Sequence, residues 1–288
     1  MKKLLNNTYS YWFLVPAGLI YVTFFIAPTF MSFFFSLTRW TLFDWEFIGL
    51  ENFIMFFQES SLKVGFRNTL FFATVTALSK VVLGFALGLV LTMGIRFTGF
   101  LRSIVFFPTI LSIVAVGITF RRLMHPAHGA INRTLALFGI SGPNWLGNVD
   151  IAMLSVSLVD VWRGVGIATV IFIAGMQAIP RDYYEAVSID GGGFWRQVWH
   201  VTVPLSRPAT NSVLLLAMIG GLRTFDLVWT MTGGGPGFST DLIASIIYKQ
   251  YQAGFYGLAT AGNVILFFVV AAIAVPLFWF LNRKEVTL

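Results

Sequence analysis

The sequence has 288 residues, of which 57% are hydrophobic and only 11% are charged, and its mean hydropathy is +0.81. Soluble domains carry about 25% charged residues, so the composition excludes an ordinary soluble protein and indicates an integral membrane protein. The absence of cysteine excludes disulfides, zinc–thiolate sites and thiol nucleophiles. The net charge of +7 fits the basic cytoplasmic loops of a membrane protein better than a nucleic-acid surface.

Six apolar segments are long enough to cross a bilayer, whose hydrocarbon core of about 30 Å needs roughly 20 helical residues. Each is continuously apolar, which favours helices over the alternating strands of a barrel. The first run is too long for a signal peptide and has no cleavage site, so we expect it to remain as a span. The predicted all-α membrane domain, 1–288, has spans at 11–37, 69–93, 103–120, 151–176, 209–231 and 256–281.

Basic residues predict the orientation of the spans, because more of them lie in the loops and termini on one side of the membrane than on the other. The loops on the other side also hold basic residues, together with acidic ones, so this difference between the two sides is modest. By the positive-inside rule, both termini are expected in the cytoplasm. The residues on the predicted inner side are Lys2, Lys3, Arg96, Arg102, Arg181, Arg196, Arg207, Arg283 and Lys284.

The longest predicted cytoplasmic loop, 181–204, contains two short helices. Asp182 is a candidate N-cap for a helix ending near residue 189, and the glycines at 191–193 stop that helix. Residues 194–201 can form the second helix, and Pro204 and Pro208 then set the entry to the fifth span. Composition alone leaves open whether this loop lies on lipid headgroups or binds another protein.

This loop reads "EAVSIDGGGFWRQVWHVTVPLSRP" and resembles the EAA loop of binding-protein-dependent ABC importer permeases. The family pattern is E-A-A-x-x-D-G-A followed, after a spacer, by I-x-L-P-x-x-x-P. The chain departs from it at Val187, Gly192 and Val203. The resemblance implies a type I ABC importer permease fold with a coupling helix that docks on a cytoplasmic ATPase. The residues assigned to coupling are Glu185, Ala186, Asp190, Gly191, Phe194 and Trp195.

A second stretch, "GGLRTFDLVWTMTGGGPGFST", follows the fifth span. It lacks the G-x-x-x-x-G-K-[ST] pattern of a nucleotide-binding loop. It resembles the carbohydrate branch of the same family, in particular the first permease of the maltose or glycerol-phosphate type. This implies an importer in the cytoplasmic membrane of a bacterium with a sugar as its substrate, and an oligosaccharide is the expected kind. It also implies a second homologous permease, two copies of an ABC ATPase and an extracellular sugar-binding protein. ATP and Mg²⁺ would bind the ATPase, and this chain would hold no cofactor.

Five ionisable residues fall within predicted spans: Lys80, Asp160, Arg163, Arg223 and Asp226. Each costs about 2.5–3.5 kcal/mol at the centre of a membrane helix, so each is expected to face a cavity or an opposite charge. Two pairs, Asp160–Arg163 and Arg223–Asp226, have the spacing of local ion pairs. The alternative is a polar cleft that binds a sugar, with Trp162 and Trp229 as nearby aromatic rings.

The resemblance favours the cleft. In maltose-type permeases the sugar lies midway across the membrane, although residue types here differ at most contact positions. Lys80 has no role assigned by the resemblance, and Gly84 with Gly88 forms a GxxxG pattern that permits close helix packing. The candidate substrate contacts are Asp160, Arg163, Gly164, Ile167, Leu222, Arg223, Asp226, Thr109 and Ile113.

Catalysis by this chain is disfavoured. His125, His128 and His200 show no metal-site spacing, and no G-x-S-x-G motif occurs. An ion-coupled secondary transporter remains the alternative function; it would be expected to have inverted repeats and broken helices, and the sequence predicts neither.

Overall fold

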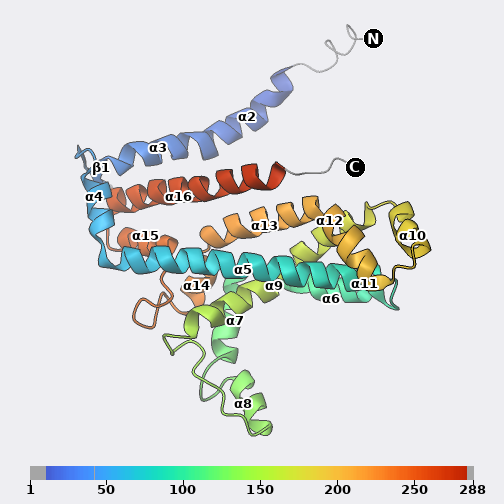
Figure 1. The fold of residues 1–288 in the computed structure, drawn as a ribbon. Helices are drawn as coiled ribbons and strands as arrows, with labels where there is room; N and C mark the ends of the chain where they lie inside the picture. Colours follow the sequence, from blue (N-terminus) through green and yellow to red (C-terminus); the bar gives the residue numbers. More distant parts are fainter. Residues whose placement is uncertain (1–10, 42, 284–288) are drawn as a thin grey trace. The chain divides into compact units, whose positions relative to one another are not determined.

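The computed structural model describes residues 11–41 and 43–283, which are predominantly helical (Figure 1). This confirms the predicted all-α class. The chain divides into two compact units, Met1–Glu59 with Ile247–Phe267, and Ser60–Ile246 with Phe268–Leu288. The predicted inner-side residues Lys2, Lys3 and Lys284 lie outside the described residues.

The first unit begins with one long apolar helix. A π-helical turn, η2, lies just before Pro28, where the missing N–H and the ring disturb regular α-helical hydrogen bonding. A short antiparallel hairpin follows, with Thr38 opposite Phe47 and Trp40 opposite Trp45. The elements are η1 (Tyr11–Leu14), α2 (Val15–Tyr21), η2 (Val22–Ile26), α3 (Ala27–Ser36), β1 (Thr38–Trp40), β2 (Trp45–Phe47) and α4 (Glu51–Gln58).

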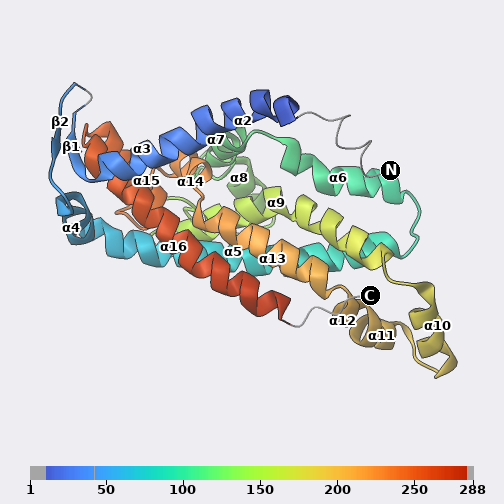
Figure 2. The same cartoon turned by 90° about the horizontal axis from the view of Figure 1, so that it is seen from above.

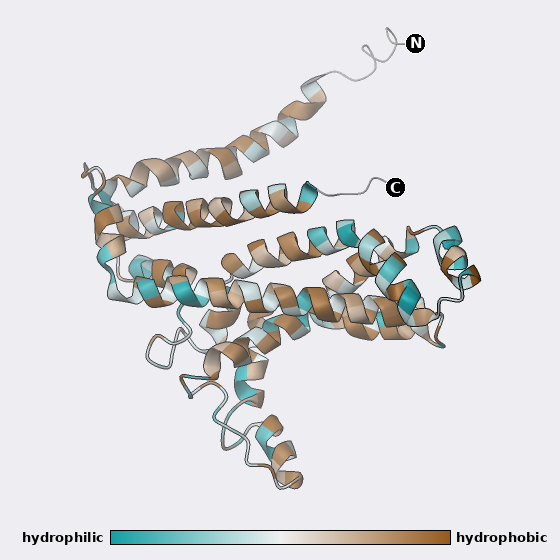
Figure 3. Cartoon of the chain, viewed as in Figure 1, coloured by the Kyte–Doolittle hydropathy of each residue, from teal (hydrophilic) through white to brown (hydrophobic). Residues whose placement is uncertain are grey.

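The second unit is built around three helices, α5, α9 and α13, which run side by side (Figures 1 and 2). Apolar residues follow these helices, whereas α10 and α11 mix polar and apolar residues (Figure 3). The remaining elements are α5 (Ser60–Thr92), α6 (Thr98–Ile110), α7 (Ile113–Leu123), α8 (Ala130–Leu137), α9 (Ala152–Gln177), α10 (Arg181–Ile189), α11 (Phe194–Gln197), η3 (Val198–Thr202), α12 (Val203–Leu205), α13 (Arg207–Leu222) and α14 (Asp226–Met231), with α15 (Ile243–Gln252) and α16 (Tyr256–Asn282) divided between the two units.

Glycines allow α5 and α9 to approach closely. A Cβ on Gly84 would lie 2.7 Å from the Cβ of Ala168, and a Cβ on Gly88 would lie 2.9 Å from the Cβ of Phe172. Any larger residue at these two positions would separate the helices. The close packing predicted from the GxxxG pattern is therefore confirmed.

Four of the six predicted spans are single helices of sufficient length and hydropathy. Among the described residues these are Trp12–Ser36, Ser60–Thr92, Ala152–Gln177 and Tyr256–Asn282. The second begins at Ser60 rather than at residue 69.

The predicted third span, 103–120, is wrong as a single helix. Helices α6 and α7 meet at 96°, because Leu111 and Ser112 adopt extended backbone, with ψ of 143° and 129°. A break at membrane depth requires other donors for the freed carbonyls, and Arg163 supplies one to Leu111.

The predicted fifth span, 209–231, is also wrong as a continuous helix. Helix α13 ends at Leu222 and α14 begins at Asp226. The interruption coincides with the polar pair Arg223–Thr224 in an otherwise apolar run. The 16 residues of α13 extend about 24 Å at 1.5 Å per residue. The sequence-based expectation of unbroken helices therefore fails at two places.

Candidate functional site

The C-terminal halves of the two broken helices, α7 and α14, pack against each other. Gly117 makes this possible, since a Cβ there would overlap the hydroxyl of Thr230 and lie 3.7 Å from Leu227 Cδ1. Leu227 is fully buried in a cluster that also contains Val116 from α7. The two half-helices thus share one core.

Lys80 is the partner of Asp160. Its Nζ lies 2.5 Å from Asp160 Oδ2, and the two side chains are only 12% and 9% exposed. Gly164, one turn further along α9, leaves room for the lysine, because a Cβ there would lie 2.6 Å from Lys80 Cε. The hypothesis of a local Asp160–Arg163 ion pair is therefore wrong, and Lys80, which had no assigned role, links α5 to α9.

Arg163 is directed to the break between α6 and α7. Its Nε donates to the carbonyl oxygen of Leu111 at 3.4 Å, and the hydroxyl of Thr109 donates to the carbonyl oxygen of Arg163 at 2.9 Å. The structure therefore brings together two predicted contact residues, Thr109 and Arg163, and adds Leu111, which sequence analysis missed. An arginine inside a predicted apolar span was the available signal, but the break itself was not predicted.

Arg223 and Asp226 flank the break between α13 and α14. Both are exposed, and in the described part of the chain no ion pair joins them, so this local-pair hypothesis is also wrong. Phe225 and Trp229 stack beside them with ring centroids 5.7 Å apart. The break therefore presents two charges and a pair of aromatic rings.

The remaining candidate contacts differ in accessibility. Ile167 is 48% exposed, whereas Leu222 is 1% exposed and belongs to the core. Ile113 is half-buried against the core that contains Leu227. In this conformation, Leu222 offers no side-chain surface to a ligand.

The coupling segment, which we define as residues 181–205, has two helical arms. Helix α10 begins at Arg181 after Pro180, with no side-chain cap, so the prediction of Asp182 as N-cap is wrong. Asp182 instead lies in the first turn, where its negative charge interacts favourably with the helix dipole. The second arm runs through α11, η3 and α12 to Leu205, four residues beyond the predicted end.

The bend between the arms requires glycine. Gly191 has φ of +72°, a left-handed conformation that other residues disfavour. Hydrogen bonds then fix the arms, from Gln197 Nε2 to Ser188 Oγ at 2.9 Å and between the hydroxyls of Tyr184 and Thr202 at 3.2 Å. The predicted two-helix loop bent at glycine is confirmed.

Two of the departures from the EAA pattern lie against each other. A Cβ on Gly192 would come within 2.5 Å of Val187 Cγ1 and 2.8 Å of its carbonyl oxygen. Relative to the alanines of the family pattern, Val187 is larger and Gly192 is smaller. The turn is preserved because the two changes compensate in volume.

The coupling segment exposes both charge and apolar surface. The side chains of Ile189, Trp195 and Trp199 are 86%, 68% and 64% exposed. The six residues assigned to coupling, Glu185, Ala186, Asp190, Gly191, Phe194 and Trp195, are all exposed as well. Such a surface is suited to docking a protein partner.

The three histidines do not assemble into a site. His125 and His128 stack with ring centroids 5.4 Å apart. Among the described residues, no group of three or more metal-ligating side chains is placed to hold an ion.

Comparison with known proteins identifies the family. Residues 80–283 match the family described as "binding-protein-dependent transport system inner membrane component". The chain is 31% identical over 268 residues to the trehalose/maltose transport system permease protein MalF of Thermococcus litoralis, covering 92% of this chain and 91% of that protein. It is 28% identical over 278 residues to the multiple sugar-binding transport system permease protein MsmF of Streptococcus mutans, covering 96% of each.

A solved structure shares the fold. It is a bacterial ABC transporter involved in the import of the acidic polysaccharide alginate, matched with a TM-score of 0.85 and 20% identity over 96% of each chain. The predicted type I permease fold and the resemblance to carbohydrate-uptake permeases are thereby confirmed. The chain belongs to the family of inner-membrane components of binding-protein-dependent transport systems.

Proposed function

We propose that this chain is one of two permease subunits of an ATP-driven importer of sugars, and that two ABC ATPase subunits dock on its cytoplasmic side. The observation that carries the proposal is the bent coupling segment, whose six assigned residues are all exposed. The relatives named for trehalose and maltose and for multiple sugars support a sugar, including an oligosaccharide, as the substrate class. ATP and Mg²⁺ bind the partner ATPases, and this chain holds no cofactor.

The coupling segment is joined directly to the two helices that carry the candidate substrate contacts. Its first arm follows α9, which carries Arg163, and its second arm leads into α13, which ends beside Arg223. Closure of the ATPases on ATP would move both arms together. That movement would reach the breaks at Leu111–Ser112 and at residues 223–225, where backbone is free to change direction.

The charged groups at these breaks are the proposed substrate contacts. Arg163, Arg223 and Asp226 offer planar hydrogen-bonding groups to sugar hydroxyls, and Trp229 offers a ring face. Thr109, Ile113, Gly164 and Ile167 shape the same region of α6, α7 and α9. Asp160 acts through its ion pair with Lys80, and Leu222 supports the core.

The exposed basic residues of the coupling segment, with the exposed Arg96 just before α6, favour the cytoplasmic side for this face of the protein. Both termini are then cytoplasmic, and an extracellular sugar-binding protein delivers substrate to the opposite face. A solved relative of the fold is an alginate transporter in complex with an oligosaccharide-bound periplasmic protein, which supports this arrangement.

The proposal is tested by purifying the tagged chain in mild detergent and identifying the chains that accompany it by mass spectrometry. We expect one related permease and an ATPase at twice its amount. Binding protein loaded with the correct sugar should stimulate ATP hydrolysis by the complex. Recovery of the chain alone, active in sugar uptake without an ATPase, would overturn the proposal.

The broken helices favour one competing function, because ion-coupled transporters bind substrates at discontinuous helices. Uptake that an uncoupler abolishes while ATP remains constant would identify that function. Uptake that depends on the ATP concentration and is unaffected by the uncoupler would exclude the ion-coupled function.

A further inference from the structure

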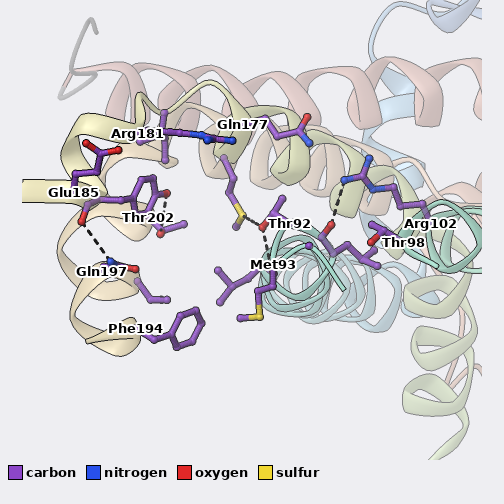
Figure 4. A pocket seen from close by; sticks show the side chains of 17 residues that line it. Thr92, Met93, Thr98, Arg102, Gln177, Arg181, Glu185, Phe194, Gln197 and Thr202 are labelled. Atoms are coloured by element: carbon purple, nitrogen blue, oxygen red, sulfur yellow. Dashed lines mark hydrogen bonds between the residues drawn. The ribbon is translucent and has the colours of Figure 1, made fainter. Parts of the chain in front are cut away.

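A cavity of about 720 Å³ lies between the coupling segment and the nearby ends of α5, α6 and α9. Figure 4 shows Glu185 and Phe194, from the coupling segment, across the cavity from Arg102 of α6. An occupant of this cavity would therefore contact the coupling segment on one side and the membrane helices on the other. The cavity contains none of the candidate substrate contacts.

The charged part of the cavity wall is basic on balance. Arg102 and Arg181 both line it, and Glu185 is the one acidic side chain among the described lining residues. The Nη2 of Arg102 donates to the carbonyl oxygen of Leu91 at 3.2 Å, but its Nε is buried and, among the described residues, has no hydrogen-bond partner. Arg102 is only partly buried, and the remaining N–H groups of its guanidinium favour an anionic acceptor in the cavity.

The uncharged part of the wall combines polar and apolar side chains. The polar ones are Thr92, Thr98, Gln177, Tyr184, Gln197 and Thr202, and the apolar ones are Leu89, Leu91, Met93, Met176, Ile179, Phe194 and Val198. A ligand that carries both an anionic group and hydrocarbon can contact all parts of this wall. A small hydrophilic anion would leave the apolar part of the wall without contacts.

The surroundings place the cavity at the depth of lipid headgroups. The cavity lies at the ends of α5 and α9, which are two of the helices long and apolar enough to cross a membrane, and the side chain of Phe97, beside the lining residue Thr98, is 80% exposed. Basic pockets between membrane helices on the cytoplasmic side are suited to lipid phosphates. The anion that is abundant at this depth is the phosphate of an anionic phospholipid.

We propose that this cavity binds an anionic phospholipid, with its phosphate at Arg102 and Arg181 and its hydrocarbon along the apolar wall, and that the bound lipid supports the coupling segment. The inference rests on the proposed function for the cytoplasmic orientation and for the ATPase partners. Lipid binding itself is a property of this chain and can be measured separately from ATP hydrolysis.

The test uses the complete transporter in nanodiscs of phosphatidylcholine containing increasing fractions of phosphatidylglycerol. Native mass spectrometry measures retained phosphatidylglycerol, and ATP hydrolysis stimulated by loaded binding protein measures coupling. In Arg102→Gln and in Arg181→Gln, the phosphatidylglycerol fraction for half-maximal retention and stimulation should rise about fivefold, the typical effect of one basic residue at an anionic surface.

Arg96→Gln and Arg207→Gln are matched controls, because both arginines are exposed and neither lines the cavity. They should leave both half-maximal fractions unchanged. An equal shift in all four variants would indicate general surface charge and would overturn the proposal. If Arg102→Gln fails to assemble, Arg102→Lys provides the second variant. Lysine keeps the charge but loses the planar donor set, so the half-maximal phosphatidylglycerol fractions should rise less in Arg102→Lys than in Arg181→Gln.

Two further outcomes are informative. One distinguishes a lipid phosphate from inorganic phosphate, and the other distinguishes failure of the lipid site from failure of the proposed function. Stimulation by inorganic phosphate in pure phosphatidylcholine, lost in Arg102→Gln, would overturn the lipid as the carrier of the phosphate. Retention of phosphatidylglycerol that depends on Arg102, in a chain that recruits no ATPase, would support the lipid site while overturning the proposed function.

Discussion

The interface between α5 and α9 and the coupling segment differ in where their charged side chains find partners. In the interface, Lys80 and Asp160 pair with each other and are only 12% and 9% exposed. In the coupling segment, Glu185 and Asp190 are exposed, and within the described residues neither forms an ion pair with a cation of this chain. The first arrangement satisfies charge within the chain, and the second leaves it available to another protein.

The glycines of the two regions also serve different purposes. Gly84 is required because a Cβ there would meet Ala168 on the neighbouring helix. Gly191 is required because of its own φ of +72° and would meet nothing described within 4 Å. Substitutions in the interface should therefore affect stability, whereas substitutions in the coupling segment should affect coupling to the ATPase.

The largest effect is expected from Lys80→Met. It leaves the Asp160 carboxylate buried without its cation, and breaking a buried ion pair from one side costs about 3–5 kcal/mol. We expect a large loss of folded, assembled permease, measured as the amount and thermal stability of the purified complex.

The control for this prediction is Lys80→Met combined with Asp160→Met. Replacement of both members of a buried ion pair by apolar residues is often nearly neutral, so the double variant should recover most of the stability. A single variant as stable as the double would show that Asp160 has another cation and would contradict the pairing.

A smaller loss of stability is expected from Gly221→Ala in α13. The new Cβ would lie 2.6 Å from Ala73 Cα on α5, and overpacking of this kind costs about 1–3 kcal/mol. Thermal unfolding of the purified complex measures the change.

The adjacent residue supplies the matched control. A Cβ on Gly220 meets no described atom within 4 Å, and alanine in a helix is favoured over glycine by about 0.5–1 kcal/mol. Gly220→Ala should therefore be neutral or stabilising. Equal destabilisation by both substitutions would mean that α13 does not pack on α5 through Gly221.

Sequence reasoning succeeded where the determinant is local. The bend at Gly191, the two arms of the coupling segment and the close approach at Gly84 and Gly88 all follow from glycine placement and helix periodicity. Four of the six spans follow from hydropathy over a sufficient length. These features depend on residues that are close together in the sequence.

Sequence reasoning failed where the partner lies far along the chain. Arg163 was expected to pair with Asp160 three residues away, but Asp160 pairs with Lys80, 80 residues away, and Arg163 binds the carbonyl of Leu111. The break at Leu111 is tolerated because Arg163 on α9 supplies a donor to the freed carbonyl. No property of residues 103–120 alone reveals this break. Hydropathy counts apolar residues and does not detect where backbone hydrogen bonds are transferred to another helix.

Arg223→Ala should lower sugar uptake without lowering assembly. The side chain is exposed at the break between α13 and α14, and a hydrogen bond from a charged donor contributes about 1.5–3 kcal/mol. We expect a loss of about tenfold in the ratio of maximal uptake rate to half-saturating sugar concentration. Sugar uptake by reconstituted vesicles measures this ratio. The control is Arg122→Ala, which changes an exposed arginine at the end of α7. Unchanged uptake in Arg223→Ala would remove Arg223 from the proposed contacts.

The smallest effect is expected from Gly191→Ala in the coupling segment. An alanine at φ of +72° carries a strain of about 1–2 kcal/mol, which the exposed turn can partly release by changing the angle between α10 and α11. The complex should assemble normally, while ATP hydrolysis stimulated by loaded binding protein should fall several-fold. Gly193 is the matched control, because its φ of −80° suits any residue and a Cβ there meets no described atom within 4 Å. If Gly193→Ala impairs stimulation as much as Gly191→Ala, the bend is flexible and its left-handed residue does not set the position of the two arms; if only Gly191→Ala impairs it, the geometry of this turn is what the ATPase recognises.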